Sequence, residues 1–290
     1  MKKINDVALE ISSLAIQAMM YEAACSPSPG LVSAISQGAH EDMDFFSFID
    51  STTSLIKYFT LCVEGGIKAG DPTTLLDELR ELGRNAELCM FKKTGGINTQ
   101  KGLIFLLGIG CAAGGIIVAR GQNLFEVRSV IKEMTKGITK RELIDLDKNK
   151  FPLTHGEELF LKFGVTGIRE EIERGLPIIF DYSLNFYKDC YKLCKNSQLI
   201  HTLIGIMQYC QDTNIIYRHS QEVLKEVQRK ATHIIEIGGM TTLDGQTAIK
   251  ELDLEFCIRK ISPGGSADLL AGTVFFSLLE KYLSDNTTFL

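Results

Sequence analysis

The residues best suited to chemistry in this 290-residue chain stand at the turns between apolar segments. One such turn carries His40, Asp42 and Asp44 immediately before an apolar stretch. Carboxylates at the start of a helix complement its dipole and cap its first free N–H groups. Carboxylate oxygens are also the ligands that Mg²⁺ prefers when it carries a polyphosphate. The pattern therefore indicates either a helix cap or a magnesium and phosphate site, and the sequence leaves both interpretations open.

A second turn, at residues 95–102, opens the most apolar segment of the chain. Asn98, Thr99 and Lys101 fall in the expected first turn of a helix, where free backbone N–H groups can bind a phosphate. A glycine stop followed by an Asn or Thr cap is the structural alternative. Lys101 is the informative residue, because a cation at the head of an otherwise uncharged segment indicates an anionic partner.

A third turn, at residues 262–270, is rich in glycine and precedes the apolar C-terminal segment. After Gly264 and Gly265 it delivers Ser266 and Asp268 into the first turn of a helix. A serine cap with Asp268 on the helix dipole would explain the pattern. A site that needs a hydroxyl group and a carboxylate would explain it equally well.

Five other turns carry isolated polar residues with the same two interpretations. Glu22 stands just before a rigid connection that contains two prolines. Asp212 and Asn214 form an Asp-x-Asn pattern, which is a common cap and can also contact a metal or a ribose. The remaining candidates are His155, Arg169 and Arg218.

Apolar residues recur at helical spacing along nearly the whole chain. We expect helices at residues 4–24, 42–63, 72–92, 99–119, 123–135, 154–163, 177–195, 197–211, 219–237, 243–260 and 266–284. Glycine and proline turns separate these segments, and the sequence has no long alternating run of the kind that strands need. The sequence therefore predicts an all-α fold of about ten or more helices, arranged as a single domain over residues 1–290.

Residues 103–119 form a 17-residue segment without a charge. A membrane-spanning helix needs about 20 apolar residues, with about 17 at the lower limit. Four glycines, at positions 108, 110, 114 and 115, give this segment small faces against which other helices can pack closely. We therefore expect a buried, glycine-rich central helix and no membrane span.

The overall composition excludes several classes of protein. Hydrophobic residues make up 45% of the chain and charged residues 23%, which is typical of a soluble globular protein and not of a disordered one. The formal net charge is −5, so no basic excess favours nucleic acid or anionic lipid. The eight cysteines are scattered without a Cys-x-x-Cys motif, which predicts reduced thiols in a cytoplasmic protein.

In chain order the polar clusters form one pattern. Its motifs are Pro27-Ser28-Pro29-Gly30, His40-x-Asp42-Met43-Asp44, Gly96-Ile97-Asn98-Thr99-x-Lys101-Gly102, Thr154-His155-Gly156, Gly167-x-Arg169, Asp212-Thr213-Asn214 and Ser262-Pro263-Gly264-Gly265-Ser266-Ala267-Asp268. From about residue 8 to residue 282, this pattern resembles the ATP:dephospho-coenzyme A triphosphoribosyl transferase family, also called triphosphoribosyl-dephospho-coenzyme A synthase. The chain departs from the family's usual residues at Ser28 (usually Lys), Ser33 (usually Asp) and Gln100 (usually His).

The resemblance implies an enzyme that moves the 5-triphosphoribosyl group of ATP to the 2′-hydroxyl of 3′-dephospho-coenzyme A. Adenine leaves from C1′, and the bonds to phosphorus stay intact. The product would be the precursor of the prosthetic group on the acyl carrier subunit of citrate lyase or malonate decarboxylase, and the sequence does not decide between them. ATP and 3′-dephospho-coenzyme A are the implied partners, and a homodimer and a transient contact with a prosthetic-group transferase are compatible with the resemblance.

The requirements of such a transfer suggest a role for each candidate residue. A tetra-anionic triphosphate needs Mg²⁺ and cationic side chains, and a cation developing at C1′ needs a nearby carboxylate. The expected Mg²⁺ ligands are Asp42, Asp44 and Asp268. The expected catalytic residues are Glu22, His40, Asp44, His155 and Asp268. The expected substrate-binding residues are Asn98, Thr99, Lys101, Arg169, Asp212, Asn214, Arg218, Gly264, Gly265 and Ser266.

Two other classes of protein fit the same sequence features. An all-α, Mg²⁺-dependent nucleotide phosphohydrolase also needs acidic helix turns, but it would release phosphate or pyrophosphate from ATP instead of adenine. In a non-catalytic nucleotide-binding helical protein, every polar cluster would be a cap.

Overall fold

The computed structural model describes residues 3–146 and 152–286. These residues form fourteen α-helices, and their only β-type pairing is an isolated bridge between Ser33 and Ser36. The all-α prediction is confirmed. The helices are α1 (Ile4–Ala24), α2 (Phe45–Ser54), α3 (Ile56–Lys68), α4 (Leu76–Lys93), α5 (Lys101–Ala119), α6 (Leu124–Thr135), α7 (His155–Phe163), α8 (Ile168–Glu173), α9 (Leu184–Asp189), α10 (Lys195–Met207), α11 (Thr213–Arg218), α12 (Gln221–Glu236), α13 (Leu243–Arg259) and α14 (Gly264–Asp285).

The glycine-rich helix α5 lies at the centre, as expected, with α1, α3, α4, α6 and α14 packed around it. Its closest neighbour is α3, because glycines remove the side chains where the two helices cross. A Cβ atom at Gly66 would lie 2.1 Å from the carbonyl oxygen of Ala112, and one at Gly115 would lie 2.3 Å from that of Val63. By length and composition α5 could cross a membrane, but 78% of its most apolar window is buried inside the protein. It is a core helix.

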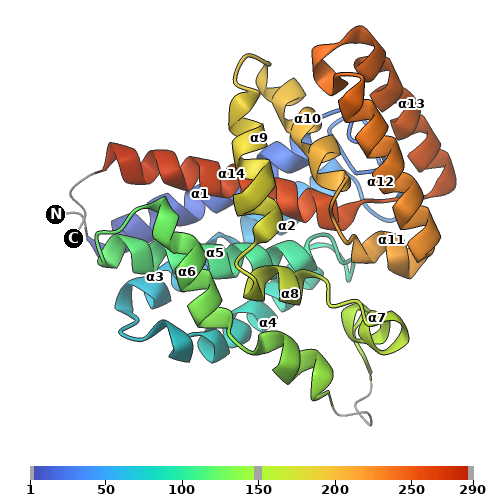
Figure 1. Ribbon diagram of the computed structural model, residues 1–290. Coiled ribbons are helices and arrows are strands. Elements are labelled where there is room, and N and C mark those ends of the chain that lie inside the picture. Colours follow the sequence, from blue (N-terminus) through green and yellow to red (C-terminus); the bar gives the residue numbers. More distant parts are fainter. Residues whose placement is uncertain (1–2, 147–151, 287–290) are drawn as a thin grey trace.

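Figure 1 shows how the other helices surround this centre. The first and last long helices, α1 and α14, lie side by side and both contact α5. Helices α10, α12 and α13 gather at the end of the molecule where α14 begins, whereas α3 and α4 lie on the opposite side of α5 from α14. The first turns of α5 and α14 are the turns that sequence patterns single out, and this arrangement brings both of them to one region.

The predicted helix boundaries are wrong in several places. The expected helix at 177–195 is a π-helical turn, Ile178–Ser183, followed by the short helix α9, which ends at Asp189. The expected helix at 42–63 is two helices, α2 and α3, which meet at Leu55. The short helices α8 and α11 were not expected, because six residues carry fewer than two turns of apolar periodicity. Two π-helical turns, Lys140–Ile144 and Ile178–Ser183, also interrupt the pattern. Such turns are frequent at functional sites, and both contribute residues to the cavity described next.

Candidate active site

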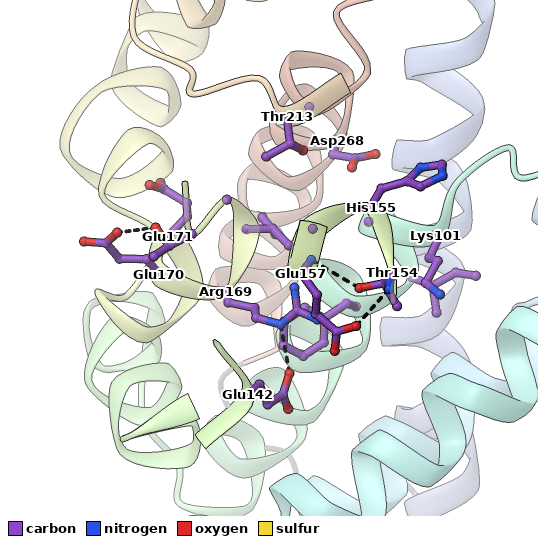
Figure 2. Close-up of a pocket in the computed structure, with 18 of the residues that line it drawn as sticks. Lys101, Glu142, Thr154, His155, Glu157, Arg169, Glu170, Glu171, Thr213 and Asp268 are labelled. Carbon is purple, nitrogen blue, oxygen red and sulfur yellow. Dashed lines mark hydrogen bonds and ion pairs between the residues drawn. The ribbon is translucent and has the colours of Figure 1, made fainter. Parts of the chain in front are cut away.

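A large cavity of about 1640 Å³ opens between α4, α5, α7, α8, α11, α12 and α14. Pockets for one small ligand usually measure about 300 to 1000 Å³. This cavity therefore has room for two nucleotide-sized molecules. Figure 2 shows that charged side chains reach it from several helices, with the Asp268 carboxylate in the upper part of the view and the Arg169–Glu142 pair in the lower part.

The Asp268 carboxyl group lines the cavity from the fifth residue of α14, just after the first turn in which the sequence had placed it. It lies directly against the first turn of α5, because a Cβ atom at Gly102 would be only 2.3 Å from its Oδ2 atom. Burial raises the pKa of Asp268 well above its ordinary value, and the nearby charges of Glu22 and Asp212 raise it further. A carboxyl group with a raised pKa is a stronger base than an exposed one, which suits it to accept a proton.

Glu22 lies behind Asp268, on α1, and does not itself line the cavity. Its side chain is almost completely enclosed, with 5% of the residue exposed. This burial raises the pKa of Glu22 to about 8. The charge of Glu22 contributes to the raised pKa of Asp268, and carboxyl groups with such perturbed pKa values are frequent in active sites.

A cluster of arginines surrounds one carboxylate at the other end of the cavity. The Nε atom of Arg80 donates to Oε1 of Glu142 at 2.8 Å, and its Nη2 atom bonds the second oxygen of the same carboxylate. Arg169 donates to Oε2 at 2.9 Å, and Arg141 lies 3.8 Å from Oε1. The Arg80 guanidinium also stacks over the Phe105 ring, 4.0 Å from its centroid. Three cations from three separate elements thus converge on one anion.

Lys101 adds a further cation to the cavity wall at the start of α5. Its ammonium group lies 2.8 Å from the Glu87 carboxylate, and 40% of its side chain remains exposed. Its backbone N–H donates to the Asn98 side chain at 3.1 Å, so Asn98 caps the helix start while lining the cavity. Asn98 therefore stabilises the helix start, and phosphate binding by this turn stays a prediction.

His155 stands at the first position of α7, where Thr154 caps the helix through a reciprocal pair of bonds with Glu157. The imidazole ring stacks on Tyr217 with centroids 3.9 Å apart and an interplanar angle of 20°. This contact fixes the ring orientation at the edge of the cavity. The next residue, Gly156, lies close to Arg169, since a Cβ atom there would be 3.0 Å from the guanidinium group.

Comparison with known proteins identifies the family of this chain. A family model described as ATP:dephospho-CoA triphosphoribosyl transferase matches residues 8–287. The chain belongs to this family. It is 38% identical to a probable 2-(5''-triphosphoribosyl)-3'-dephosphocoenzyme-A synthase of Malonomonas rubra, over 96% of this chain and 90% of that protein.

Other relatives of this triphosphoribosyl transferase are similarly distant. The chain is 36% identical to a probable synthase of the same name from Lactiplantibacillus plantarum, over 93% of this chain and 97% of that protein. It is 35% identical to Protein CitXG of Leuconostoc mesenteroides subsp. cremoris, over 93% of this chain and 59% of that protein. No solved structure matches the chain. The resemblance inferred from the motifs is confirmed.

The transferase cavity collects about half of the residues that the sequence singled out. Those that line it are Asn98, Lys101, His155, Arg169, Asn214, Gly265 and Asp268. Those that do not are Glu22, His40, Asp42, Asp44, Thr99, Asp212, Arg218, Gly264 and Ser266. The second group still bears on the site, because several of its members hold the first group in place.

Asp212 is the main supporting residue. It is buried, and its Oδ1 atom accepts hydrogen bonds from the backbone N–H groups of Asn214 and Ile215 at the start of α11. Its Oδ2 atom accepts the backbone N–H and the hydroxyl of Ser266 at 2.9 and 3.2 Å. One carboxylate therefore ties the beginnings of α11 and α14 together and fixes the turn that carries Asp268.

The three expected metal ligands are not brought together. Asp44 caps α2, where its Oδ1 atom accepts the N–H and the hydroxyl of Ser47, both at 2.9 Å. Asp42 is 59% exposed and lies 3.6 Å from His40, whereas Asp268 lies in the cavity. Within residues 3–146 and 152–286, no group of three or more His, Cys, Asp and Glu residues is placed to hold a metal ion. The side chains do not fit a resident metal site.

His40 has a structural environment. Its Nε2 atom lies 2.9 Å from the Ser262 hydroxyl, which connects the loop after α1 to the segment before α14. Burial lowers the pKa of His40, and the charge of Arg218 lowers it further. His40 therefore stabilises the segment before α14, outside the lining of the cavity.

The departures from the usual family motifs do not alter the cavity wall. Ser28 is buried and donates to the Cys25 carbonyl at 2.7 Å. The Gln100 side chain is buried and accepts from the hydroxyls of Ser51 and Thr52 at 2.9 and 3.2 Å, so it joins α5 to α2. Ser33 is also buried, and none of the three departures lines the cavity.

The sequence interpretation missed most of the arginine cluster. Arg80 lies in an amphipathic helix whose charged residues usually face solvent, and Arg141 and Glu142 lie between the helices expected at 123–135 and 154–163. One signal was present: Arg80 and Arg84 are four residues apart, which places both on one face of α4. Both of them line the cavity.

Proposed function

We propose that this chain transfers the 5-triphosphoribosyl group of ATP to the 2′-hydroxyl of 3′-dephospho-coenzyme A and releases adenine. The observation that carries this proposal is one cavity, large enough for two nucleotides, with a buried carboxyl group at one end and converging arginines at the other. The relatives that share almost the full length of the chain bear the name of a synthase of the corresponding product.

In the proposed reaction the bond between C1′ and the adenine nitrogen breaks, and its electron pair leaves with adenine. The acceptor oxygen then forms the new bond to C1′ and loses its proton. The Asp268 carboxylate would stabilise the positive charge at C1′ and take the acceptor proton. His155 would give adenine the proton that it needs as a leaving group. Both side chains line the cavity.

The triphosphate would be bound by Lys101 and Arg169, since guanidinium and ammonium groups form the strongest hydrogen bonds to phosphate. Asn214 and Gly265 lie near Asp268 on the wall where a ribose would bind. ATP would enter as its Mg²⁺ complex, so the cation belongs to the substrate and needs no resident protein site. In solution it neutralises part of the triphosphate charge.

The product would be a coenzyme A derivative that becomes the prosthetic group of the acyl carrier subunit of citrate lyase or malonate decarboxylase. A prosthetic-group transferase is then the expected next partner. All eight cysteines are free thiols, which is in keeping with a cytoplasmic location.

The test is chromatography of the purified protein after incubation with ATP, Mg²⁺ and 3′-dephospho-coenzyme A. We expect adenine and a heavier coenzyme product in equal amounts, and no adenine when the acceptor is omitted. Release of phosphate or pyrophosphate without adenine would instead identify a phosphohydrolase. A protein that binds ATP without any product would support the non-catalytic alternative.

A further inference from the structure

The arginine cluster at residues 80, 141 and 169 contains more positive charges than a structural ion pair with one carboxylate needs. The Glu142 carboxylate is the common partner of all three guanidinium groups, and Asp77 pairs with Arg141 at 3.0 Å. Asp77 is 83% exposed, so solvent screens much of its charge. Three guanidinium charges are therefore gathered against one partly enclosed carboxylate.

The surroundings hold these cations in place and point them into the cavity. Phe105 supports the flat face of Arg80, and the absence of a side chain at Gly156 lets Arg169 lie against α7. The side chains of Arg80, Arg169 and Glu142 are 23%, 18% and 20% exposed, so they face a partly enclosed space, whereas the Arg141 side chain is 49% exposed. Burial lowers the pKa of Arg80, and the neighbouring Arg169 and Arg141 lower it further, while Glu142 opposes the change.

We propose that Arg80, Arg141 and Arg169 bind the polyphosphate chain of a nucleotide substrate, and that Glu142 occupies the place of a phosphate group until the substrate arrives. A carboxylate and a phosphate group present similar oxygen pairs to an arginine fork. Glu142 therefore holds the three cations together in the empty enzyme, and phosphate oxygens replace it when the nucleotide binds. The proposal rests on the proposed function only for the identity of the nucleotide.

Inorganic triphosphate is the direct probe, because it carries the polyphosphate without a base, a ribose or any turnover. Calorimetric titration should show that Arg141→Gln and Arg80→Gln each weaken its binding by about tenfold to a hundredfold, the range for one lost charged hydrogen bond. Arg128→Gln is the matched control, since Arg128 makes a similar paired contact with Asp181 outside the cavity. Unchanged binding in both cavity variants would overturn the proposal.

The variant Glu142→Gln tests whether Glu142 stands in for a phosphate group or only forms a structural ion pair. Removing the charge takes from Arg80 and Arg169 the anion that they share, so the unliganded variant should melt at a lower temperature. Inorganic triphosphate should then bind several-fold more tightly than to the wild type and raise the melting temperature by a larger amount. Weaker binding, or a smaller rise, would contradict the placeholder role of Glu142.

The steady-state constants of Arg141→Gln identify which substrate supplies the polyphosphate. A raised KM for ATP alone assigns the site to the triphosphate, and a raised KM for 3′-dephospho-coenzyme A alone assigns it to the acceptor's diphosphate. Either result supports the proposal. If neither KM changes, the proposal is overturned. The proposed function fails separately, since an enzyme that binds inorganic triphosphate at these arginines and releases no adenine would disprove only that function.

Discussion

At the scale of single residues, the position of the Asp268 carboxylate depends on a glycine in another helix. A methyl group at position 102 would come within 2.3 Å of Oδ2, a distance that no real contact allows. Gly102→Ala should therefore displace the carboxylate and lower the rate of adenine release by about a hundredfold, the effect expected of a misplacement near 1 Å. The measurement is kcat with both substrates saturating.

A second glycine supplies the control for this prediction. Gly65 also lies inside a helix, but a Cβ atom there would meet its nearest neighbour at 3.5 Å, an ordinary contact distance. Gly65→Ala should keep the wild-type kcat and gain up to about 1 kcal/mol of stability from its higher helix propensity. If both variants kept full activity, the Asp268 carboxylate would not need its observed position.

Glu22 gives stability a dependence on pH that can be measured separately from turnover. The folded chain keeps the proton of this carboxyl group up to about pH 8, whereas the unfolded chain releases it near 4.5. The contribution of Glu22 to the free energy of unfolding therefore falls as the pH rises between these two values. Glu22→Gln should match the wild type near pH 5 and exceed its stability at pH 8.5, by at most about 5 kcal/mol.

Urea unfolding of both proteins at these two pH values tests the prediction. A difference between variant and wild type that stays constant from pH 5 to pH 8.5 would mean that the Glu22 carboxyl group is ionised throughout, contrary to its burial.

At the scale of elements, two helix starts depend on one buried carboxylate. Asp212 accepts hydrogen bonds from the first turns of both α11 and α14. Asp212→Ala would leave several buried N–H groups without acceptors and should cost about 3 kcal/mol of unfolding free energy. Asp44→Ala removes a cap from α2 alone, at a half-exposed position, and should cost less. Equal losses in the two variants would contradict the joining role of Asp212.

The sequence predicted elements well where their periodicity was long. The expected ranges 4–24 and 99–119 lie within two residues of α1 and α5, because each carries five turns of apolar spacing. The sequence-based prediction failed where a helix was too short to show a repeating apolar pattern, as in α8 and α11. The break at Leu55 follows a polar run at residues 50–54 that contains no glycine or proline, so the sequence lacks the residues that usually mark a turn there.

At the scale of the whole molecule, the site depends on contacts between distant parts of the chain. Motif residues such as Lys101, His155 and Asp268 were recognisable because glycine and proline turns mark the starts of their helices. Arg80 and Arg141 carry no such mark, and only the packing of α4 against the π turn at Lys140–Ile144 and α8 brings them to Arg169. The same packing separates Asp42 and Asp44 from Asp268, which sequence spacing could not show.

The most direct test of the whole account compares adenine release by the wild type with that by Asp268→Asn. The amide keeps the size of the carboxyl group but cannot take a proton or stabilise a cation at C1′. We expect the rate to fall by about 10² to 10⁴-fold, while ATP with Mg²⁺ still raises the melting temperature of the variant. Asp181→Asn, which changes a carboxylate outside the cavity, should keep the wild-type rate. Wild-type adenine release by Asp268→Asn would show that the reaction takes place elsewhere or without this carboxylate.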